Sequence, residues 1–247
     1  YKVFTEQTGG THRLLFVAHR EEILKQSRKT YRSVLQDANF GELWVGNSQP
    51  INGFDFLFIS VATFNSKYES IFQKLPSDYY DYIVIDEAHH LVADSYRKIL
   101  SKFTPKLLIG LTATPERMDG VSLLPDFANQ ISAEIRLPKA LDEGLLTPFQ
   151  YLCISDDTDL TDEELMQGNR YVANKLTEKL CYQGRVGLII NRLQYYLPDE
   201  HKCRALGFCA TKKHARYMAE EFCRVGLKAA YLTSDNDAER LSLNKQL

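Results

Sequence analysis

Apolar residues along this chain fall into short runs, separated by longer stretches in which apolar residues recur with the spacing of a helix. Four runs predict strands, at residues 13–18, 56–61, 82–86 and 107–112. The intervals predict helices at residues 21–35, 64–74 and 95–103. The strand runs are almost entirely apolar, which is typical of a parallel sheet covered by helices on both faces. The first part of the chain is therefore expected to be an α/β lobe around a parallel sheet.

The pattern changes near Pro138, where proline and glycine interrupt the chain repeatedly. A strand-like run (149–154), an acidic run (156–164) and two amphipathic stretches (170–182 and 186–197) follow. The α/β pattern then resumes with a strand at 204–209, a helix at 212–224, a strand at 229–232 and a helical start at 238. These changes predict a first lobe at residues 1–137, a connector at 138–200 and the beginning of a second lobe at 201–247.

Composition limits the function classes more than it identifies one. With 247 residues, 44% of them hydrophobic, the chain can bury a substantial core. Its apolar runs are far shorter than the roughly 20 residues that span a bilayer, so we expect no membrane contact and a cytoplasmic location. The five cysteines form no CxxC or zinc spacing and are expected to be reduced thiols in the core. A net charge of −2 gives no overall basic field, so nucleic-acid binding would need a local surface.

Two adjacent carboxylates follow the third predicted strand. The apolar residues 82–85 end in Asp86-Glu87-Ala88-His89-His90. In open α/β sheets ligands bind beyond the carboxyl ends of the strands, where this pair lies. One carboxylate can hold Mg²⁺, which prefers oxygen ligands, and its neighbour can orient or deprotonate the water that attacks a γ-phosphate. A bare Asp-Glu pair more often caps a helix, and a metal site of Asp86, His89 and His90 is a third reading without a supporting ligand motif.

A second motif decides between these readings. Leu111-Thr112-Ala113-Thr114-Pro115 follows the next strand. A strand ending in DEAH, followed by a strand ending in TAT, resembles the second and third signature motifs of superfamily-two helicases of the DEAD/DEAH type. In that family the Asp binds magnesium, the Glu activates the hydrolytic water and the His couples the nucleotide site to the third motif.

The resemblance assigns these roles to Asp86, Glu87 and His89, with Thr112 and Thr114 as coupling hydroxyls. It implies ATP and Mg²⁺ as cofactors. It also implies a fold with a RecA-like lobe of the P-loop NTPase type, a connector and an incomplete second RecA-like lobe.

Three further segments resemble parts of the family that contact the nucleic-acid backbone. The first contains His19 and Arg20, where a strand exit and a helix N-terminus offer free N–H groups to phosphate. The second contains Thr63, and the third, at the start of the second lobe, contains Thr211 and Lys212. The segments FVAHREEIL and VIDEAHH are most similar to the helicase subunits of type I and type III restriction enzymes and to related DNA repair helicases. DNA, duplex or single-stranded, is therefore the expected partner, with nuclease or other domains of a longer parent protein.

The chain lacks two motifs with which the family contacts the nucleotide, the phosphate loop and the arginine finger. No G-x-x-x-x-G-K-[ST] phosphate loop occurs, since Thr8-Gly9-Gly10-Thr11 lacks the lysine and precedes a strand. Residues 1–7 instead predict the tail of a helix that stops at Gly9 or Gly10. Arg240 comes too early to be the family's arginine finger. We expect that the chain begins just downstream of the phosphate loop and hydrolyses ATP negligibly by itself, while its parent protein is an ATPase.

Three functions remain open at this point. The first is a part of an ATP-dependent DNA helicase or translocase. The second is a nucleic-acid or protein binding module that has lost its nucleotide loop, and the two carboxylates and the histidine disfavour it because binding alone does not need them. The third is an unrelated α/β hydrolase or metal-dependent enzyme that uses Asp86 and His89, and the absence of a G-x-S-x-G motif disfavours it.

Overall fold

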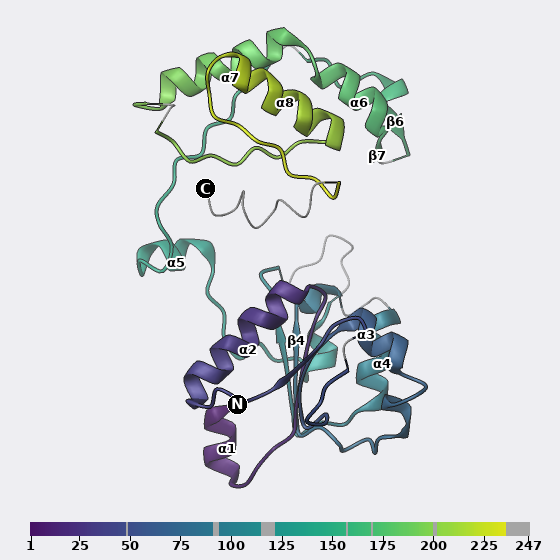
Figure 1. Ribbon diagram of the computed structural model, residues 1–247. Helices are drawn as coiled ribbons and strands as arrows, with labels where there is room; N and C mark the ends of the chain where they lie inside the picture. The colour runs from purple at the N-terminus through teal and green to yellow at the C-terminus, as the bar shows by residue number, and fades with distance from the viewer. Residues whose placement is uncertain are drawn as a thin grey trace. The chain divides into compact units, whose positions relative to one another are not determined.

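The computed structural model describes residues 1–47, 49–90, 94–114, 122–156, 158–168, 170–199 and 202–235, without the side chains at positions 90 and 94. The chain divides into two compact units, 1–147 and 148–247 (Figure 1). The boundary lies inside the connector expected at 138–200, and the division into three parts stays a prediction. Each unit is described by itself below.

The first unit is built on a parallel sheet. Its strands are β1 (Leu14–Ala18), β2 (Glu42–Trp44), β3 (Phe56–Ser60), β4 (Tyr82–Asp86) and β5 (Leu107–Leu111), in the order β2-β3-β1-β4-β5. β1 is central, because Val17 pairs with Ile59 of β3 on one side and with Ile85 of β4 on the other. All pairs are parallel, so the carboxyl ends of the five strands lie at one edge. The predicted α/β class with a parallel sheet is confirmed.

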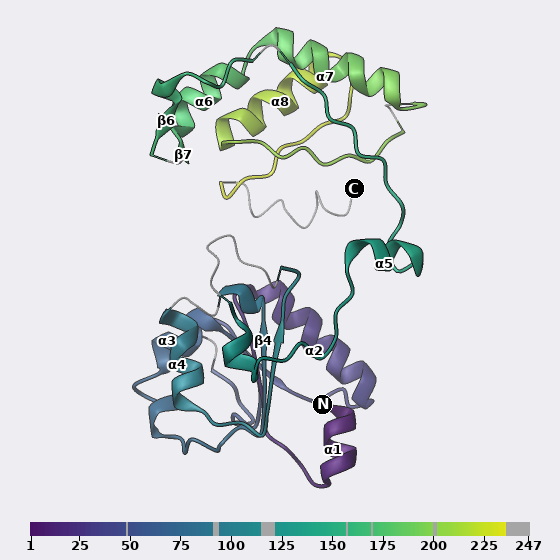
Figure 2. The same cartoon turned by 180° about the vertical axis from the view of Figure 1, so that it is seen from behind.

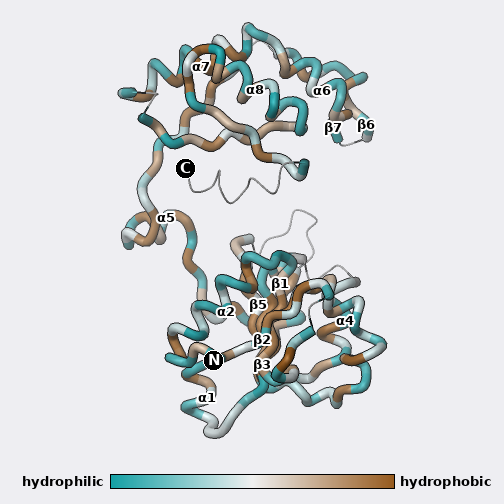
Figure 3. Tube along the Cα trace, in the orientation of Figure 1, coloured by the Kyte–Doolittle hydropathy of each residue, from teal (hydrophilic) through white to brown (hydrophobic). Residues whose placement is uncertain are grey.

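Helices cover both faces of this sheet (Figures 1 and 2). The helices of the first unit are α1 (Lys2–Thr8), α2 (Glu21–Leu35), α3 (Val61–Lys67), α4 (Asp94–Lys102) and α5 (Leu137–Asp142), with 3-10 turns η1 (Phe72–Lys74), η2 (Ala88–His90) and η3 (Leu124–Phe127). Leu14 and Phe16 of β1 face a core shared with α2, whereas Leu15 and Val17 face a core shared with α3 and α4. This alternation explains why the strands are apolar at every position, as the brown centre of Figure 3 shows.

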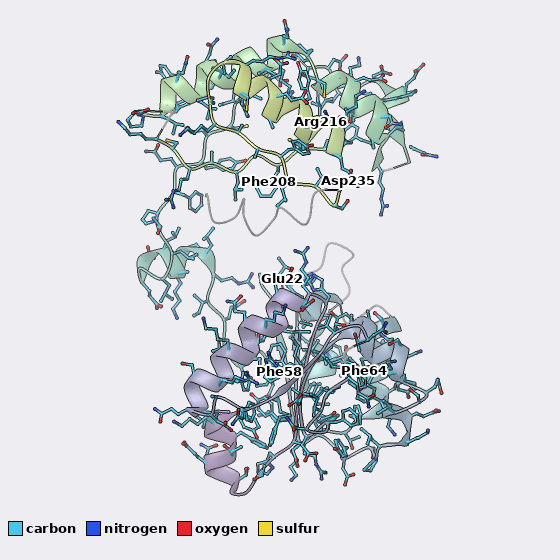
Figure 4. All side chains as sticks on the ribbon, viewed as in Figure 1. Glu22, Phe58, Phe64, Phe208, Arg216 and Asp235 are labelled. Atoms are coloured by element: carbon cyan, nitrogen blue, oxygen red, sulfur yellow. The ribbon has the colours of Figure 1, made fainter. Side chains whose placement is uncertain are left out.

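Aromatic side chains fill both cores. Phe58 packs on the α2 side and Phe64 on the α3 side, and both are fully buried (Figure 4). The single tryptophan, Trp44, lies at the end of the edge strand β2 with 1% of its surface exposed. It stacks on Phe54 with a centroid separation of 5.4 Å and contacts Phe72 at 5.9 Å. Burying one large apolar side chain contributes roughly 1.5–3 kcal/mol, so these rings account for much of the stability of the first unit.

The element boundaries in the first unit follow from local signals, with one wrong prediction. α1 ends at Gly9, whose φ of 71° suits glycine, and α2 has the predicted bounds. The bounds predicted for the next helix, 64–74, are wrong: α3 begins at residue 61 and ends at 67, and the 3-10 turn η1 follows. Ser60 sets the earlier start, because its side chain accepts a hydrogen bond from the backbone N–H of Thr63 and so caps the helix. The three-residue strand β2 was not predicted.

The second unit contains three α-helices, one 3-10 turn and one short hairpin among its described residues. They are η4 (Glu163–Leu165), β6 (Met166–Gln167), β7 (Arg170–Tyr171), α6 (Ala173–Leu180), α7 (Gln183–Tyr196) and α8 (Lys212–Arg224). α8 has the predicted bounds, and α6 and α7 occupy the two predicted amphipathic stretches. The strands predicted at 149–154, 204–209 and 229–232 are wrong, since no strand is formed there.

The physical reason is that an extended segment becomes a strand only when a neighbouring backbone pairs with it. Such pairing is missing at these segments in the described part of the unit. Their apolar side chains are consequently exposed, 83% for Tyr151 and 95% for Phe208 (Figure 4). The helical start at 238 and Arg240 lie outside the described residues.

Two expectations from composition have different outcomes. All five cysteines are free thiols, but none is buried: three are exposed and two intermediate, so their placement in the core was wrong. Within the described residues, no helix has both the length and the apolar character that crossing a bilayer would require.

A polar network joins the amino ends of the strands, at the edge opposite to the carboxylate pair. Asp81, just before β4, accepts hydrogen bonds from the backbone N–H of Arg13 at 3.1 Å and from Lys106 Nζ at 2.7 Å. Burial alone would raise the pKa of Asp81, but the hydrogen bonds from Lys106 and Arg13 and the charge of Lys106 lower this pKa below its ordinary value. The carboxylate thus ties together the residues that precede β1, β4 and β5.

Asp81→Asn is expected to lower the free energy of unfolding by about 1 kcal/mol at neutral pH, because it removes an acceptor for charged and backbone donors. A depressed folded-state pKa stabilises the fold above the unfolded value of about 3.9, and this contribution is lost as the pH falls through the folded pKa. Urea unfolding of both proteins should therefore differ at neutral pH and converge in acid. Asp78→Asn, at an exposed position in the same loop, is the control, and an equal effect there would contradict the prediction.

Candidate active site

Asp86 and Glu87 lie at the carboxyl edge of the sheet, as the sequence predicted. Asp86 is the last residue of β4, and its Oδ1 accepts a hydrogen bond from the backbone N–H of Glu87 at 2.9 Å. Glu87 forms the turn into η2 with a φ of 53°, in the left-handed region that costs a residue with a Cβ roughly 1–2 kcal/mol. Both residues are partly buried.

A hydrogen-bond chain links Glu87 to the segment after β5. His89 Nδ1 lies 3.2 Å from Glu87 Oε2 and 3.2 Å from Thr112 Oγ1. Thr112 Oγ1 in turn accepts from the backbone N–H of Thr114 at 3.1 Å. Because β4 and β5 are neighbours in register, with Asp86 opposite Leu111, the two motifs leave the sheet side by side. The structure thus brings together four of the residues selected from the sequence, with Asp86 adjacent to them.

The donor set at Asp86 fits a magnesium ion that is shared with phosphate oxygens. The Glu87 amide binds one carboxylate oxygen, which leaves the other as a hard oxygen ligand. Mg²⁺ in nucleotide sites needs one or two carboxylates, with water and phosphate as its remaining ligands. Among the described residues no group of three or more His, Cys, Asp or Glu could hold a metal by itself. The alternative site of Asp86, His89 and His90 gains no support, since His89 contacts Glu87 and Thr112, and the His90 side chain lies outside the described residues.

Tyr96 forms the buried wall behind the carboxylates, and sequence reasoning did not select it. This α4 residue is 3% exposed and belongs to the same core as Ala88. Burial, with the charges of Asp86 and Glu87, raises the pKa of Tyr96 to about 12. The phenol therefore stays neutral and adds no third negative charge to the site. Its position in an amphipathic helix is an ordinary core signal, so nothing in the sequence separated it from other core residues.

His19 and Arg20 follow β1 and are exposed at the same edge of the sheet. β1 pairs with β4, so this exit loop is a neighbour of the one that carries Asp86. Arg20 Nε donates a hydrogen bond to His19 Nε2 at 3.1 Å, and Arg20 is the N-cap of α2 without a side-chain cap. The N–H groups of the first turn, which can donate to a phosphate, therefore lack a cap from this side chain. Glu21 and Glu22 lie in the same turn, however, and their negative charges repel an anion. Arg20 supplies the opposing positive charge.

Thr63, the expected nucleic-acid contact of the second segment, is buried. Only 3% of it is accessible, and its Oγ1 accepts from the backbone N–H of Gly46 at 2.8 Å. The same hydroxyl lies 2.7 Å from Ser60 Oγ. The side chain therefore holds the loop after β2 against the start of α3. A Ser three positions before a Thr at a strand exit is a capping signal that sequence reasoning could have used.

Thr211 and Lys212 lie in the second unit, at the start of α8. Thr211 Oγ1 accepts from the backbone N–H of His214 at 3.2 Å and lies 2.6 Å from Thr177 Oγ1 of α6. Lys212 Nζ pairs with Asp235 at 2.5 Å, where both side chains are more than half exposed. Thr211 thus fixes the helix start, and Lys212 is held beside it by an ion pair that solvent screens.

Comparisons with known proteins agree with this geometry. Residues 2–117 match the family model described as "Type III restriction enzyme, res subunit". A Saccharomyces cerevisiae protein named "Putative ATP-dependent helicase IRC3" is 24% identical over 241 residues, which are 94% of this chain and 34% of that protein. The Escherichia coli "Type I restriction enzyme EcoAI endonuclease subunit" is 27% identical over 165 residues, 61% of this chain and 20% of that protein. The resemblance expected from the two motifs is confirmed.

Among solved structures, the crystal structure of the Pyrococcus furiosus Hef helicase domain is similar with a TM-score of 0.43 and 16% identity. The match covers 87% of this chain and 45% of that chain. This chain therefore spans less than half the length of each of these three proteins.

The left-handed turn at Glu87 predicts a reversed order of stability between two variants. Glu87→Gly should be more stable than Glu87→Ala by about 1 kcal/mol, because only glycine adopts this φ without a Cβ clash. At Lys29, exposed in the middle of α2, the order should be the ordinary one, with alanine better than glycine by about 1 kcal/mol. Urea unfolding of the four variants measures both differences. The same order at both positions would show that the turn is not strained.

Proposed function

We propose, from the premise that this chain is a relative of restriction-enzyme helicase subunits, that it is part of an ATP-dependent DNA helicase or translocase. The observation that carries the proposal is the continuous link from Glu87 through His89 to Thr112 and Thr114. A strand-end carboxylate pair that only capped a helix would not need a histidine and a hydroxyl from the next strand. A site in which nucleotide hydrolysis changes the conformation of another part of the protein does need such a link.

In the proposed site, Asp86 binds the magnesium ion, whereas Glu87 acts on the attacking water. Asp86 would hold the magnesium ion, which would supply positive charge to neutralise the phosphates. Glu87 orients the attacking water and accepts its proton at Oε1 or Oε2. His89 holds the Glu87 carboxylate in place through Nδ1, and Thr112 holds His89. Glu87 and Thr112 can share the same Nδ1–H of His89, and Thr112 Oγ1 can accept from it and from the backbone N–H of Thr114 at once, so a shift of either segment changes the hydrogen bonding of the other.

DNA is the proposed nucleic-acid substrate, and its phosphates are proposed to bind at the same edge of the sheet. Arg20 and His19 supply the charge and the donors, and Thr63 acts indirectly by holding the Gly46 loop. Thr211 and Lys212 are the proposed contacts of the second unit. The whole protein is proposed to be cytoplasmic and to carry further domains, such as a nuclease. Its helicase or translocase action depends on residues that these 247 do not include, since they contain no G-x-x-x-x-G-K-[ST] sequence.

A binding module without ATPase activity is the second candidate, favoured by the same missing motif. The two candidates differ in the sequence that precedes Tyr1 in the parent protein. A strand followed by G-x-x-x-x-G-K-[ST] within about 30 residues supports the ATPase, because the loop and its lysine grip the phosphates. A parent without that loop supports the binding module.

Arg20→Ala is expected to weaken DNA binding several-fold without sequence preference, because one phosphate contact is lost. The slope of log K against log salt should become less steep by about 1 in titrations between about 50 and 200 mM salt. Lys29→Ala makes the same charge change on the exposed face of α2 and should have little effect. Equal binding by the wild type and the Arg20 variant would remove this loop from the DNA surface.

The chain itself is expected to hydrolyse ATP negligibly, with or without DNA, because it contains no phosphate-loop lysine. Phosphate release should be the same for the wild type and for Glu87→Gln, which removes the proposed base with little change in shape. The measurement is a phosphate-release assay with both proteins at equal concentration. DNA-stimulated release that Glu87→Gln abolishes would contradict the expectation.

A further inference from the structure

Gly110 of β5 leaves room for an aromatic ring beside the carboxylate turn. A Cβ built on Gly110 would lie 2.4 Å from Cζ and 2.8 Å from Cε1 of Phe127, and 3.0 Å from the Cβ of Ala88. Real atoms do not approach so closely, so the tip of the Phe127 ring rests on the backbone of Gly110, next to the Ala88 methyl group. Ala88 is the residue between Glu87 and His89. The ring tip and the methyl group next to the proposed catalytic pair therefore both lie close to the same point on Gly110.

Phe127 is held from its other side as well. It is the last residue of η3, and the preceding Asp126 accepts a hydrogen bond from Arg97 Nη1 of α4 at 2.7 Å. Asp126 is 17% exposed, so this ion pair is more shielded than a surface pair. The ring itself packs against the core that contains Ala88 and Tyr96. Phe127 thus joins α4, β5 and η2.

Strained backbone flanks this contact on both sides. Glu87, directly before Ala88, has a φ of 53°, and Ala128 and Asn129, directly after Phe127, have φ values of 54° and 56°. None of the three is glycine, and such conformations persist only where the surroundings fix them. Gln36, the one other described non-glycine residue with a positive φ, is the C-cap of α2, where this conformation is common. Ala128 is likewise the C-cap of η3, and asparagine tolerates this region, so the strain that depends on the surrounding packing is that of Glu87, directly before Ala88.

We infer that Phe127 is a positioning residue for Glu87 and His89, which acts by packing on Gly110 beside Ala88, the residue between them. The chain continues from Phe127 through the left-handed pair 128–129 and α5 into the second unit. Phe127 is therefore the residue beside Gly110 from which the chain runs on toward the connector. Through this packing on Gly110, Phe127 sets the distance between Glu87 and His89. The functional meaning of this coupling rests on the role proposed for Glu87 in water activation.

The first test replaces the ring in the full chain and observes His89 directly. Phe127→Leu removes the ring tip, so the turn loosens and the ring-nitrogen resonances of His89 shift toward those of a free imidazole. The resonances are assigned by their loss in His89→Gln. Phe103→Leu is the matched control, since Phe103 is 2% exposed in the same core but contacts the rings of Tyr80 and Phe64. It should lower stability and leave His89 unchanged.

A second test adds a Cβ at Gly110, and it remains informative even if one variant folds poorly. Gly110→Ala places a methyl group where the ring tip lies, so by itself it should shift the His89 resonances. Combined with Phe127→Leu, the new methyl group fills the vacated space, and the resonances should return most of the way to their wild-type positions. Shifts that simply add in the double variant overturn the inference, as does an unchanged His89 in Phe127→Leu or an equal shift in Phe103→Leu.

These measurements are made without nucleotide or DNA. A failure of the proposed ATPase or DNA-binding function therefore leaves their outcome unaffected, and a failure of the positioning role leaves the proposed function standing.

Discussion

Parallel pairing of β1 with its two neighbours is the constraint on which the rest of the first unit depends. Because Val17 is in register with both Ile59 and Ile85, the exits of three strands lie side by side. The exposed Arg20 loop, the buried Ser60 cap and the Asp86-Glu87 turn are therefore neighbours, although up to about 70 residues separate them along the chain. The apolar side chains that fix this register on both faces are the same ones that hold the polar exits in place.

The sequence was sufficient where the signal is local. Strand β4 and its DEAH exit, helix α2 and helix α8 each combine an apolar period with a clear start, and all three were predicted with their observed bounds. The link between His89 and Thr112 was also accessible, because both residues directly follow strands that pair. The three wrong strands had the same local pattern. What they lack is a pairing partner, and pairing is a property of distant backbone that no window of sequence contains.

The roles that sequence reasoning missed depend on an absent side chain, on packing between distant segments, or on a hydroxyl group that is buried. Gly110 matters because it has no side chain, and Phe127 matters because of where the chain folds back after β5. Thr63 was expected to contact DNA, yet its hydroxyl is used by Gly46 and Ser60 inside the protein. The carboxylate turn combines these features: a strained backbone at Glu87, a neutral Tyr96 behind it and an aromatic ring beside it. The surrounding packing thus stabilises a conformation that the local sequence disfavours.

The burial of Trp44 has a spectroscopic consequence. It is the sole indole of the chain and lies in the first unit, packed between Phe54 and Phe72. Its emission therefore reports the melting of that unit alone, whereas circular dichroism follows the helices of both. When two units melt independently, the two signals have different midpoints, and a single transition is no longer a sufficient description. The chain thus contains a natural fluorophore that separates the cooperativity of one unit from that of the other.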